Sequence, residues 1–580
     1  MSILRWFSSL SLVSAIVAGG LSAQESEPQK KLTGWSERAA ANWWAEHSEP
    51  ESWQAGADEL HGLLLAAQAE HGIAKVFANS HFAAWLEHLR WLTLYGQAKD
   101  ANGFLSTANG AAVFARISRE APLLTEIFTA SLSTYDNVPR AAEILCEIYA
   151  ADPKVAVEYR KLAVAFALVF DQPFPQSWPH SNARKSQLAI GDENPVERFK
   201  FYLRCVDAKA FLIDPKRLSV RELMCVVDTP LEFRELQYVQ QVKLKNAERL
   251  KDVYQAIPYD KARLDGGASM WEGTYRLIDI GRNGGVCADQ AFYMTQCGKA
   301  KGVPTVIFVG QGRNGGHAWT GFMPEPGNWN LEVAKYRQEK YPVGKAFDPQ
   351  TWRRVTSDQF NLLVKAQGGG SSADRAARLV LQWAEMNVGH SDYPALLAHA
   401  RKLAPQLLEA WEMEEARLGE SRASADQWRT FWQSWIMAFR DQPDLEFRGQ
   451  MRLIRALRVL GEKPAEERLR SSIEKDNVSG RFDLAVAIAA DGVLELLEMG
   501  KLEEASKAFD AVINDFKSKA GGLLFYNLIV PYIDLCIEKE FSDQAAAALR
   551  TVDSKLEFST SGTVSFDLKT LRDRVRAASL

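Results

Sequence analysis

The sequence predicts an α+β protein in which a short strand-containing segment lies between two helical regions. Three observations lead to this fold class. Apolar residues recur at spacings of three and four over residues 33–180, which is the period of an amphipathic helix. Over residues 284–350 the pattern changes to one helix followed by short β-branched runs. Beyond residue 374 the pattern is helical again and carries a loose repeat.

Length and composition limit the class of protein. A chain of 580 residues exceeds a single hydrophobic core, and its length suggests about three or four domains. Apolar residues make up 47% and charged residues 24%, as in ordinary globular proteins. The net charge of −4 gives no overall positive field that would attract nucleic acid. We therefore expect no nucleic-acid partner.

Residues 1–23 are typical of a secretory signal peptide. One arginine precedes an apolar run of roughly 15 residues, and small residues follow before an acidic, polar stretch. Cleavage after Ala23 or after Gly20 fits this order. The run is shorter than the roughly 20 residues that span a bilayer, although an uncleaved N-terminal anchor is the alternative. We expect an exported protein, periplasmic or secreted, with no membrane span after signal cleavage.

Changes in composition indicate the domain boundaries. Residues 33–180 form a helical domain, which ends in the proline-rich stretch "DQPFPQSWPHSNARK". Residues 181–366 form the central domain, and "QGGGSSAD" is a flexible joint to residues 374–580. In this last part Gly461 and Gly500 occupy matching points of a repeat, and a third copy follows. The pattern predicts helical repeats of a TPR-like α-solenoid, a type of array that binds protein partners.

The stretch "GGVCADQAFYMTQCGKAKGVPTV" (residues 284–306) places a cysteine at the start of a predicted helix. Unpaired N–H groups and the positive end of the helix dipole favour a thiolate there, so we expect a lowered pKa for Cys287. Gly284 and Gly285 would let a substrate chain approach the sulfur. The alternative is a small buried cysteine on a core helix.

Three predicted strands follow this helix, in "TVIFVGQG", "GGHAWTGFM" and "EPGNWNLEV". If they pair as neighbouring hairpins, His317 reaches the start of the helix, and a polar residue on the third strand orients its imidazole. This is the nucleophile, base and orienter arrangement of a catalytic triad. Glu332 is the favoured orienter, and Asn330 and Asp348 are the alternatives.

At these residues the sequence resembles the transglutaminase-like superfamily, a branch of the papain-like cysteine hydrolase fold, in its bacterial exported type. The matching motifs are Gly285-Val286-Cys287, Gly302-Val303-Pro304, His317-Ala318-Trp319, and Trp329 with Glu332. The resemblance implies a papain-like central domain with Cys287 as nucleophile and His317 as general base and acid. The family usually has Asp followed by Pro at the third position, where this chain has Glu332-Val333.

The reaction implied by the resemblance is acyl transfer or hydrolysis at peptide or carboxamide bonds, and peptidase, transglutaminase and deamidase activities all stay open. The expected partner is a protein or peptide substrate, such as a cell-envelope peptide. We expect no cofactor and no metal, because the sequence has no CxxC pair, calcium loop, Walker motif or dinucleotide motif. The competing hypothesis is a non-catalytic scaffold that binds a partner through its helical repeats.

Overall fold

The computed structural model of the chain describes residues 46–47, 49–98, 103–132, 135–191, 194–265, 271–312, 316–336, 342–367, 371–477, 480–518, 520–558 and 563–578. The signal peptide predicted at residues 1–23 therefore lies outside the described residues. The chain divides into two compact units, Met1–Leu89 and Arg90–Leu580.

Helices form the described part of the first unit. The elements are η1 (Pro50–Ser52), α3 (Trp53–His71), α4 (Ile73–Phe77) and the first half of α5 (Ser80–Ala98). Trp53, Leu60 and Leu64 on α3 are almost fully buried, so this helix has one buried apolar face.

The second unit begins with a succession of short helices that leads to Cys287. They are η3 (Phe104–Ser106), α6 (Ala108–Ile117), α7 (Ala121–Ala130), α8 (Val138–Ala151), α9 (Pro153–Glu158), α10 (Arg160–Val169), η4 (Lys185–Gln187), α11 (Pro195–Asp207), η5 (Pro215–Arg217), α12 (Val220–Val227), α13 (Phe233–Gln240), η6 (Ala247–Leu250), α14 (Lys251–Ala256), α15 (Lys261–Asp265), α16 (Leu277–Asn283) and α17 (Cys287–Ala300). Side chains cap several of them. Ser219 and Glu222 form a reciprocal capping box at the start of α12, which satisfies two otherwise unpaired N–H groups.

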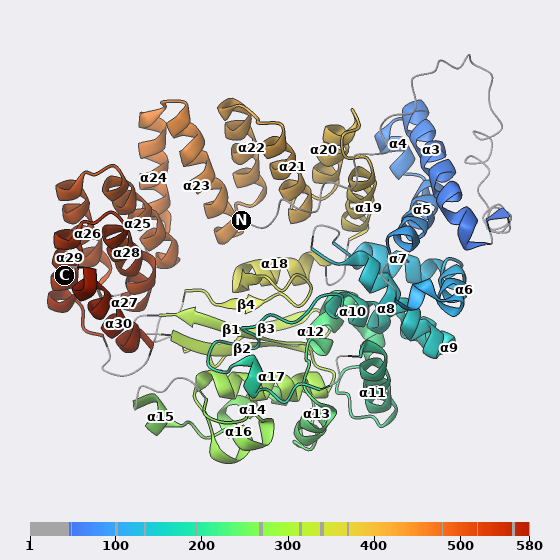
Figure 1. Cartoon of the computed structure of the whole chain (residues 1–580), viewed down its shortest axis with the longest axis horizontal. Helices are drawn as coiled ribbons and strands as arrows, with labels where there is room; N and C mark the ends of the chain where they lie inside the picture. Colours follow the sequence, from blue (N-terminus) through green and yellow to red (C-terminus); the bar gives the residue numbers. More distant parts are fainter. Residues whose placement is uncertain are drawn as a thin grey trace. The chain divides into compact units, whose positions relative to one another are not determined.

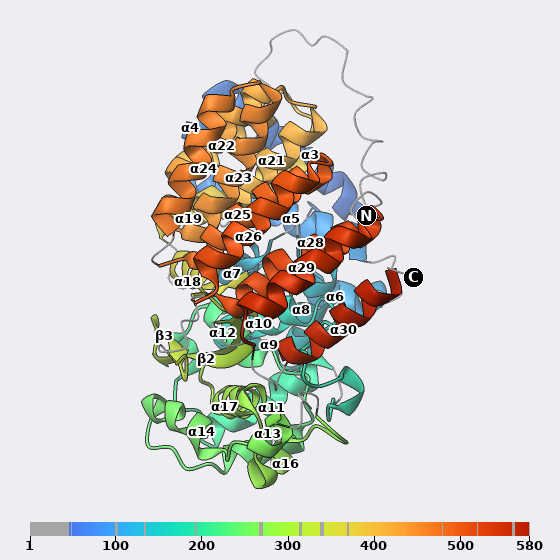
Figure 2. The same ribbon diagram turned by 90° about the vertical axis from the view of Figure 1, so that its left-hand side faces the viewer.

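A five-stranded antiparallel sheet follows α17. Its strands are β1 (Thr305–Gln311), β2 (Gly316–Glu325), β3 (Asn328–Val333), β4 (Lys345–Phe347) and β5 (Arg354–Thr356), in the order β3-β2-β1-β4-β5. On one face the Thr320 hydroxyl donates to the sulfur of Met294 on α17. On the other face Trp319 and Phe308 pack with Phe360 of α18 (Ser357–Gln367). Figures 1 and 2 show the sheet between these two helices.

The predicted α+β fold class with a central papain-like domain is wrong. The described residues are mostly helical, and their strands form one small antiparallel sheet. Helices from the two predicted flanks also contact each other directly. Arg90 pairs with Glu385 at 2.8 Å, and the Tyr135 hydroxyl donates to Glu412. The sheet and α17 are thus part of a largely helical body in the second unit.

The remaining helices pack largely as consecutive pairs. They are α19 (Ser372–Met386), α20 (Tyr393–Leu403), α21 (Leu408–Glu420), α22 (Ala425–Ala438), α23 (Pro443–Val459), α24 (Lys463–Asn477), α25 (Phe482–Glu498), α26 (Leu502–Phe516), α27 (Gly521–Leu524), η8 (Phe525–Ile529), α28 (Val530–Glu538), α29 (Ser542–Lys555) and α30 (Thr563–Ala578). Large apolar side chains from successive helices form shared cores along this part.

The repeat predicted from Gly461 and Gly500 has one turn geometry in all three copies. Both glycines have a φ of 73°, and Glu540 takes the same place in the third copy with a φ of 60°. In each copy the next residue donates its N–H to the carbonyl five residues earlier, at 2.8–3.0 Å. This is the Schellman ending of a helix, so the three pairs turn in the same way.

Among the described residues, one helical stretch is apolar and long enough to cross a membrane, Gly521–Glu538. Of this stretch, 56% is buried inside the structure. Leu524, Phe525 and Ile533 are fully buried in the core shared with α25, α26 and α29. Its apolar character is therefore used in packing between helices.

Candidate functional site

Cys287 is the first residue of α17 and differs from the other cysteines in its exposure. All six cysteines are free thiols, and five of them are buried, whereas Cys287 is half-buried. The helix starts here because the Asp289 carboxylate accepts the N–H of Val286 at 2.8 Å, which satisfies a donor at the helix N-terminus. The local sequence thus sets both where the helix begins and where the thiol is presented.

The two glycines before Cys287 make room for the protein's own atoms. Gly284 has a φ of 82°, and a Cβ there would lie 2.4 Å from the carbonyl oxygen of Pro258. A Cβ on Gly285 would lie 2.4 Å from the Cβ of Asp289. Side chains at both positions would meet neighbouring protein atoms, and the expectation that these glycines let a substrate chain approach the sulfur stays a prediction.

The start of β2 lies directly against the thiol. The backbone N–H of Ala318 lies close enough to the Cys287 sulfur to lower the pKa of this thiol. The Tyr254 hydroxyl donates to the Ala318 carbonyl at 2.7 Å and lies 3.2 Å from the Cys287 carbonyl. Two independent contacts therefore join the helix that carries Cys287 to the residue that follows His317.

The His317 ring is held at one nitrogen by the backbone of the neighbouring loop. The side chain is buried, and Nε2 lies 2.7 Å from the carbonyl oxygen of Ala334. A carbonyl oxygen only accepts hydrogen bonds, so Nε2 carries the hydrogen and Nδ1 is the basic nitrogen. Ala334 has a φ of 61°, and this left-handed conformation shapes the backbone that presents the oxygen at the end of β3.

The predicted third members of the triad lie as follows. The Glu332 side chain is 50% exposed, and its carboxylate pairs with the Lys335 ammonium at 3.2 Å. Asn330 is exposed, and its side-chain oxygen accepts the N–H of Glu332 at 3.1 Å. In the structure, the ring Nε2–H of His317 donates to the backbone carbonyl oxygen of Ala334.

Asp348 belongs to a separate buried network beyond the end of β4. Its carboxylate pairs with Arg221, and both side chains are 3% exposed. It also accepts the Thr351 hydroxyl at 2.7 Å. The Arg221 guanidinium in turn donates to the side chain of Gln350 at 3.0 Å. These contacts join α12 to the loop after β4 and pair two buried opposite charges.

The electrostatic surroundings keep Cys287 as a thiol. Burial raises the pKa of Cys287, and the carboxylate of Asp289 raises it further, while hydrogen bonds from the N–H groups of Ala318 and Ala288 lower it. The net pKa shift is upward, so the expectation of a lowered pKa is wrong. The helix start does favour the thiolate, but loss of water around the sulfur outweighs it.

Two tyrosines lie at the exposed edge of the site. Tyr336 is 39% exposed and its ring stacks on the His317 imidazole with 4.9 Å between the ring centres. Tyr259 is 48% exposed. Burial and, after it, the charge of a Cys287 thiolate raise the pKa of both phenols, and the pKa of Tyr259 reaches about 12. Tyr336 is therefore close to both the proposed base and the proposed nucleophile.

Sequence reasoning missed Asp289, Tyr254 and Ala334. The spacing of Asp289, three residues after Val286, is the spacing of a helix-capping side chain and would have identified it. Tyr254 is placed by tertiary structure alone. Ala334 acts through its backbone, so its residue type carries no signal.

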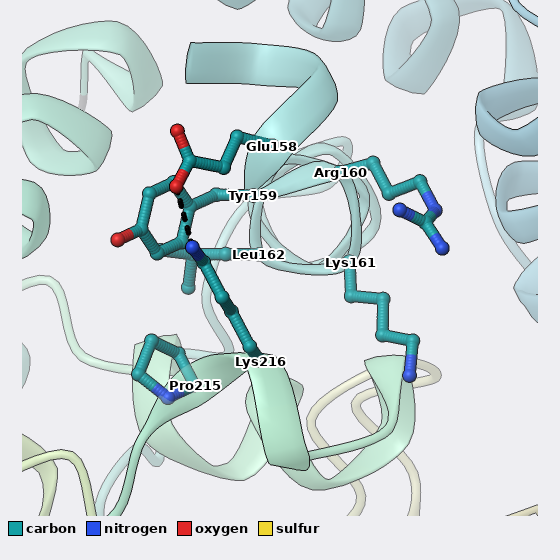
Figure 3. A pocket seen from close by; sticks show the side chains of 7 residues that line it. All are labelled: Glu158, Tyr159, Arg160, Lys161, Leu162, Pro215 and Lys216. Carbon is teal, nitrogen blue, oxygen red and sulfur yellow. Dashed lines mark hydrogen bonds and ion pairs between the residues drawn. The ribbon is translucent and has the colours of Figure 1, made fainter.

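The described residues contain a small hollow on other elements. It is lined by Glu158, Tyr159, Arg160, Lys161, Leu162, Pro215 and Lys216 (Figure 3). Lys216 crosses it to pair with Glu158 and lies 4.5 Å from the Tyr159 ring centre. Its volume of 170 Å³ is below the roughly 300 Å³ at which ligand pockets begin. We place no functional site there.

Within the described ranges, no group of three or more His, Cys, Asp or Glu side chains is arranged to hold a metal ion. Comparison of the chain with protein-family models, with curated proteins and with solved structures finds no match.

Proposed function

We propose that the protein is an exported thiol enzyme that performs acyl transfer or hydrolysis at peptide or carboxamide bonds. Cys287 is the nucleophile, and His317 is the general base and acid. The observation that carries this proposal is the closeness of the Ala318 N–H to the Cys287 sulfur, whose pKa it lowers. It brings the residue next to His317 to the only half-buried thiol of the chain.

The chemistry follows from the protonation states. Because the pKa of Cys287 is raised, the resting group is a thiol, and it needs a base at the moment of attack. Nδ1 of His317 takes the thiol proton as the sulfur–carbon bond forms. The imidazolium then gives this proton to the leaving amine as the carbon–nitrogen bond breaks, which leaves a thioester on Cys287.

The thioester has two outcomes that both balance. Water attacks it with His317 as the base, and the products are a carboxylic acid and the free thiol. Alternatively a primary amine attacks, and the products are a new amide and the free thiol. Neither route needs a cofactor.

We propose that the Ala334 carbonyl orients the His317 ring, the role predicted for the third member of the triad. It fixes the ring and its tautomer through Nε2–H, as the orienting group of a triad does. Because the carbonyl is neutral, it stabilises the imidazolium less than a carboxylate would. We therefore propose a Cys287–His317 pair with a backbone orienter, and a smaller contribution from Glu332.

Export and substrate class rest on the sequence. The predicted leader of residues 1–23 supports an exported protein, so that peptides of the cell envelope are the proposed substrates. The transglutaminase-like resemblance stays a prediction that rests on the four motifs around Cys287, His317 and Glu332.

The experiment compares wild type, Cys287→Ala and Cys297→Ala in two assays. One assay measures incorporation of a fluorescent primary amine into a glutamine-containing peptide, and the other detects cleavage of the same peptide by mass spectrometry. We expect Cys287→Ala to lose both products. Cys297 is buried on the same helix, so its variant controls for the loss of a thiol. Equal product from wild type and Cys287→Ala would disprove the proposal.

A second candidate function is a scaffold that binds a protein through its helical repeats. Two observations favour it, namely the upward pKa shift of Cys287 and the shared turn geometry of the three helix pairs. Affinity capture with the full chain and its Cys287→Ala variant separates the two functions. A scaffold keeps the same partners in both, and both proteins then also lack acyl-transfer activity.

A further inference from the structure

A buried hydrogen-bond network lies directly beneath Cys287. The Asp289 side chain is 0% exposed and accepts three donors. They are the Val286 N–H at 2.8 Å, the Tyr275 hydroxyl at 2.8 Å and the Arg263 guanidinium. A carboxylate with three donors, one of them charged, is well satisfied in a buried place. Asp289 thereby holds the peptide unit that enters Cys287.

The proton positions in the rest of the network follow from its donors. The Asn182 N–H donates to Nδ1 of His180 at 3.2 Å, so Nε2 of this ring carries the hydrogen. Nε2 lies 2.9 Å from the Tyr275 oxygen and donates to it. The Tyr275 hydrogen is then directed to Asp289. Hydrogen bonds are thus donated in one direction, from His180 to Tyr275 and from Tyr275 to Asp289, and the His180 ring is neutral.

Aromatic packing fixes these groups from the sides. Phe292 of α17 stacks on Tyr275 with 5.1 Å between the ring centres, and its edge meets His180 at 6.1 Å. The Arg263 guanidinium lies 5.2 Å from the ring centre of Trp271, in the geometry of a cation–π contact. His180, Tyr275 and Arg263 therefore each pack against an aromatic ring.

We propose that His180, Tyr275, Asp289 and Arg263 form a positioning network that sets the backbone geometry of Val286–Cys287 for acyl transfer. This inference rests on the proposed function of Cys287. None of the four residues is proposed to touch the substrate. Their effect passes through the Val286 N–H, the only backbone group of the helix start that Asp289 is seen to hold.

Asp289 has two opposite effects on Cys287. Its negative charge disfavours the thiolate, whereas its hydrogen bond to the Val286 N–H positions the sulfur. Its negative charge raises the pKa of Cys287, so an electrostatic role alone would make its loss beneficial to the nucleophile. A positioning role has the opposite sign, because loss of the anchor misplaces the sulfur. A neutral variant therefore shows which effect dominates.

The test uses the full chain with Asp289→Asn and Tyr275→Phe. Tyr293→Phe is the matched control, since Tyr293 is a buried tyrosine of α17 whose hydroxyl pairs with Tyr238. Three readouts are taken: hydrogen exchange of the peptide spanning residues 284–290, the pH dependence of Cys287 alkylation by iodoacetamide, and kcat with KM in the amine-incorporation assay.

We expect Asp289→Asn to lower the thiol pKa, to speed exchange in 284–290 and to reduce kcat at least about tenfold with little change in KM. Tyr275→Phe should speed the same exchange and reduce kcat, while Tyr293→Phe leaves all three readouts near wild type. Unchanged exchange, or an unchanged or higher kcat in both network variants, would overturn the proposal. If Asp289→Asn does not fold, Tyr275→Phe decides.

Failure of the proposed function gives a different pattern. Wild type would then show no amine incorporation, but exchange and alkylation need no catalysis. Faster exchange in the two network variants would still establish that the network holds the helix start. Exchange equal to wild type would overturn the positioning role independently of activity.

Discussion

The Nε2 atom of His317 donates its hydrogen to the backbone oxygen of Ala334 across 2.7 Å. A main-chain oxygen cannot be removed by changing a side chain, and its position depends on the left-handed turn at residue 334. The orientation of the imidazole is thus a property of the chain path at the end of β3. We therefore expect Glu332, the acidic residue on β3, to contribute less to the orientation of His317.

Glu332→Gln should leave the proposed activity nearly unchanged. Its side chain is 50% exposed and pairs with Lys335, and exposed ion pairs contribute little. We expect kcat/KM within about twofold of wild type, while His317→Ala loses about a hundredfold or more. Amine incorporation measured for the two variants side by side checks this. A loss with Glu332→Gln as large as with His317→Ala would restore the acidic residue to the triad.

Gly285→Ala should damage both stability and activity. Its Cβ would lie 2.4 Å from the Cβ of Asp289, and crowding of this kind costs about 2 kcal/mol. The control is Gly492→Ala, in the interior of α25, where the nearest atom to an added Cβ is the end of Arg470 at 3.8 Å. That control should gain up to about 1 kcal/mol, because alanine favours helices. Thermal unfolding and amine incorporation report both effects, and a Gly285→Ala protein as stable as wild type would contradict the clash.

A glycine at position 540, in the turn of the third repeat, should make the protein more stable. Glu540 has a φ of 60°, which costs a residue with a side chain about 1 kcal/mol. Glu540→Gly should therefore raise the free energy of unfolding, and Gly500→Ala should lower it by about the same amount. Chemical denaturation of the two variants measures these opposite changes. Two shifts in the same direction would argue against a common turn.

His180 should make the protein less stable in acid. Burial, together with the charges of Arg263 and Arg354, lowers its pKa to about 3, whereas a histidine in an unfolded chain titrates near 6.5. Between these pH values the unfolded chain binds a proton that the folded protein does not. The stability contribution is therefore complete above pH 6.5 and falls as the pH drops toward 3.

His180→Gln removes this titration and keeps a donor for Tyr275. Its free energy of unfolding should change less steeply between pH 6.5 and about 4 than that of wild type. His390→Gln is the control, since the His390 side chain is 41% exposed. Urea unfolding at a series of pH values gives the slopes. Parallel curves for wild type and His180→Gln would mean that His180 does not contribute to acid sensitivity.

Local patterns predicted the helix at Cys287 and the first three strands, because these depend on spacing over a few residues. The fold class was wrong because it depends on contacts such as Tyr135 with Glu412, which lie 277 residues apart. Short-range patterns contain no information about such pairs. The raised pKa of Cys287 depends on burial of its sulfur, and this burial is also a product of long-range packing.

The hydroxyl of Tyr254 ties Ala318 to Cys287 through both of their carbonyl groups. Main-chain atoms therefore fix the position of Cys287 relative to the start of β2. If the protein acts on peptides as proposed, the partly exposed phenol rings of Tyr259 and Tyr336 are where it would select among them. Exchange of these two rings would then change specificity and leave the bond-making atoms in place.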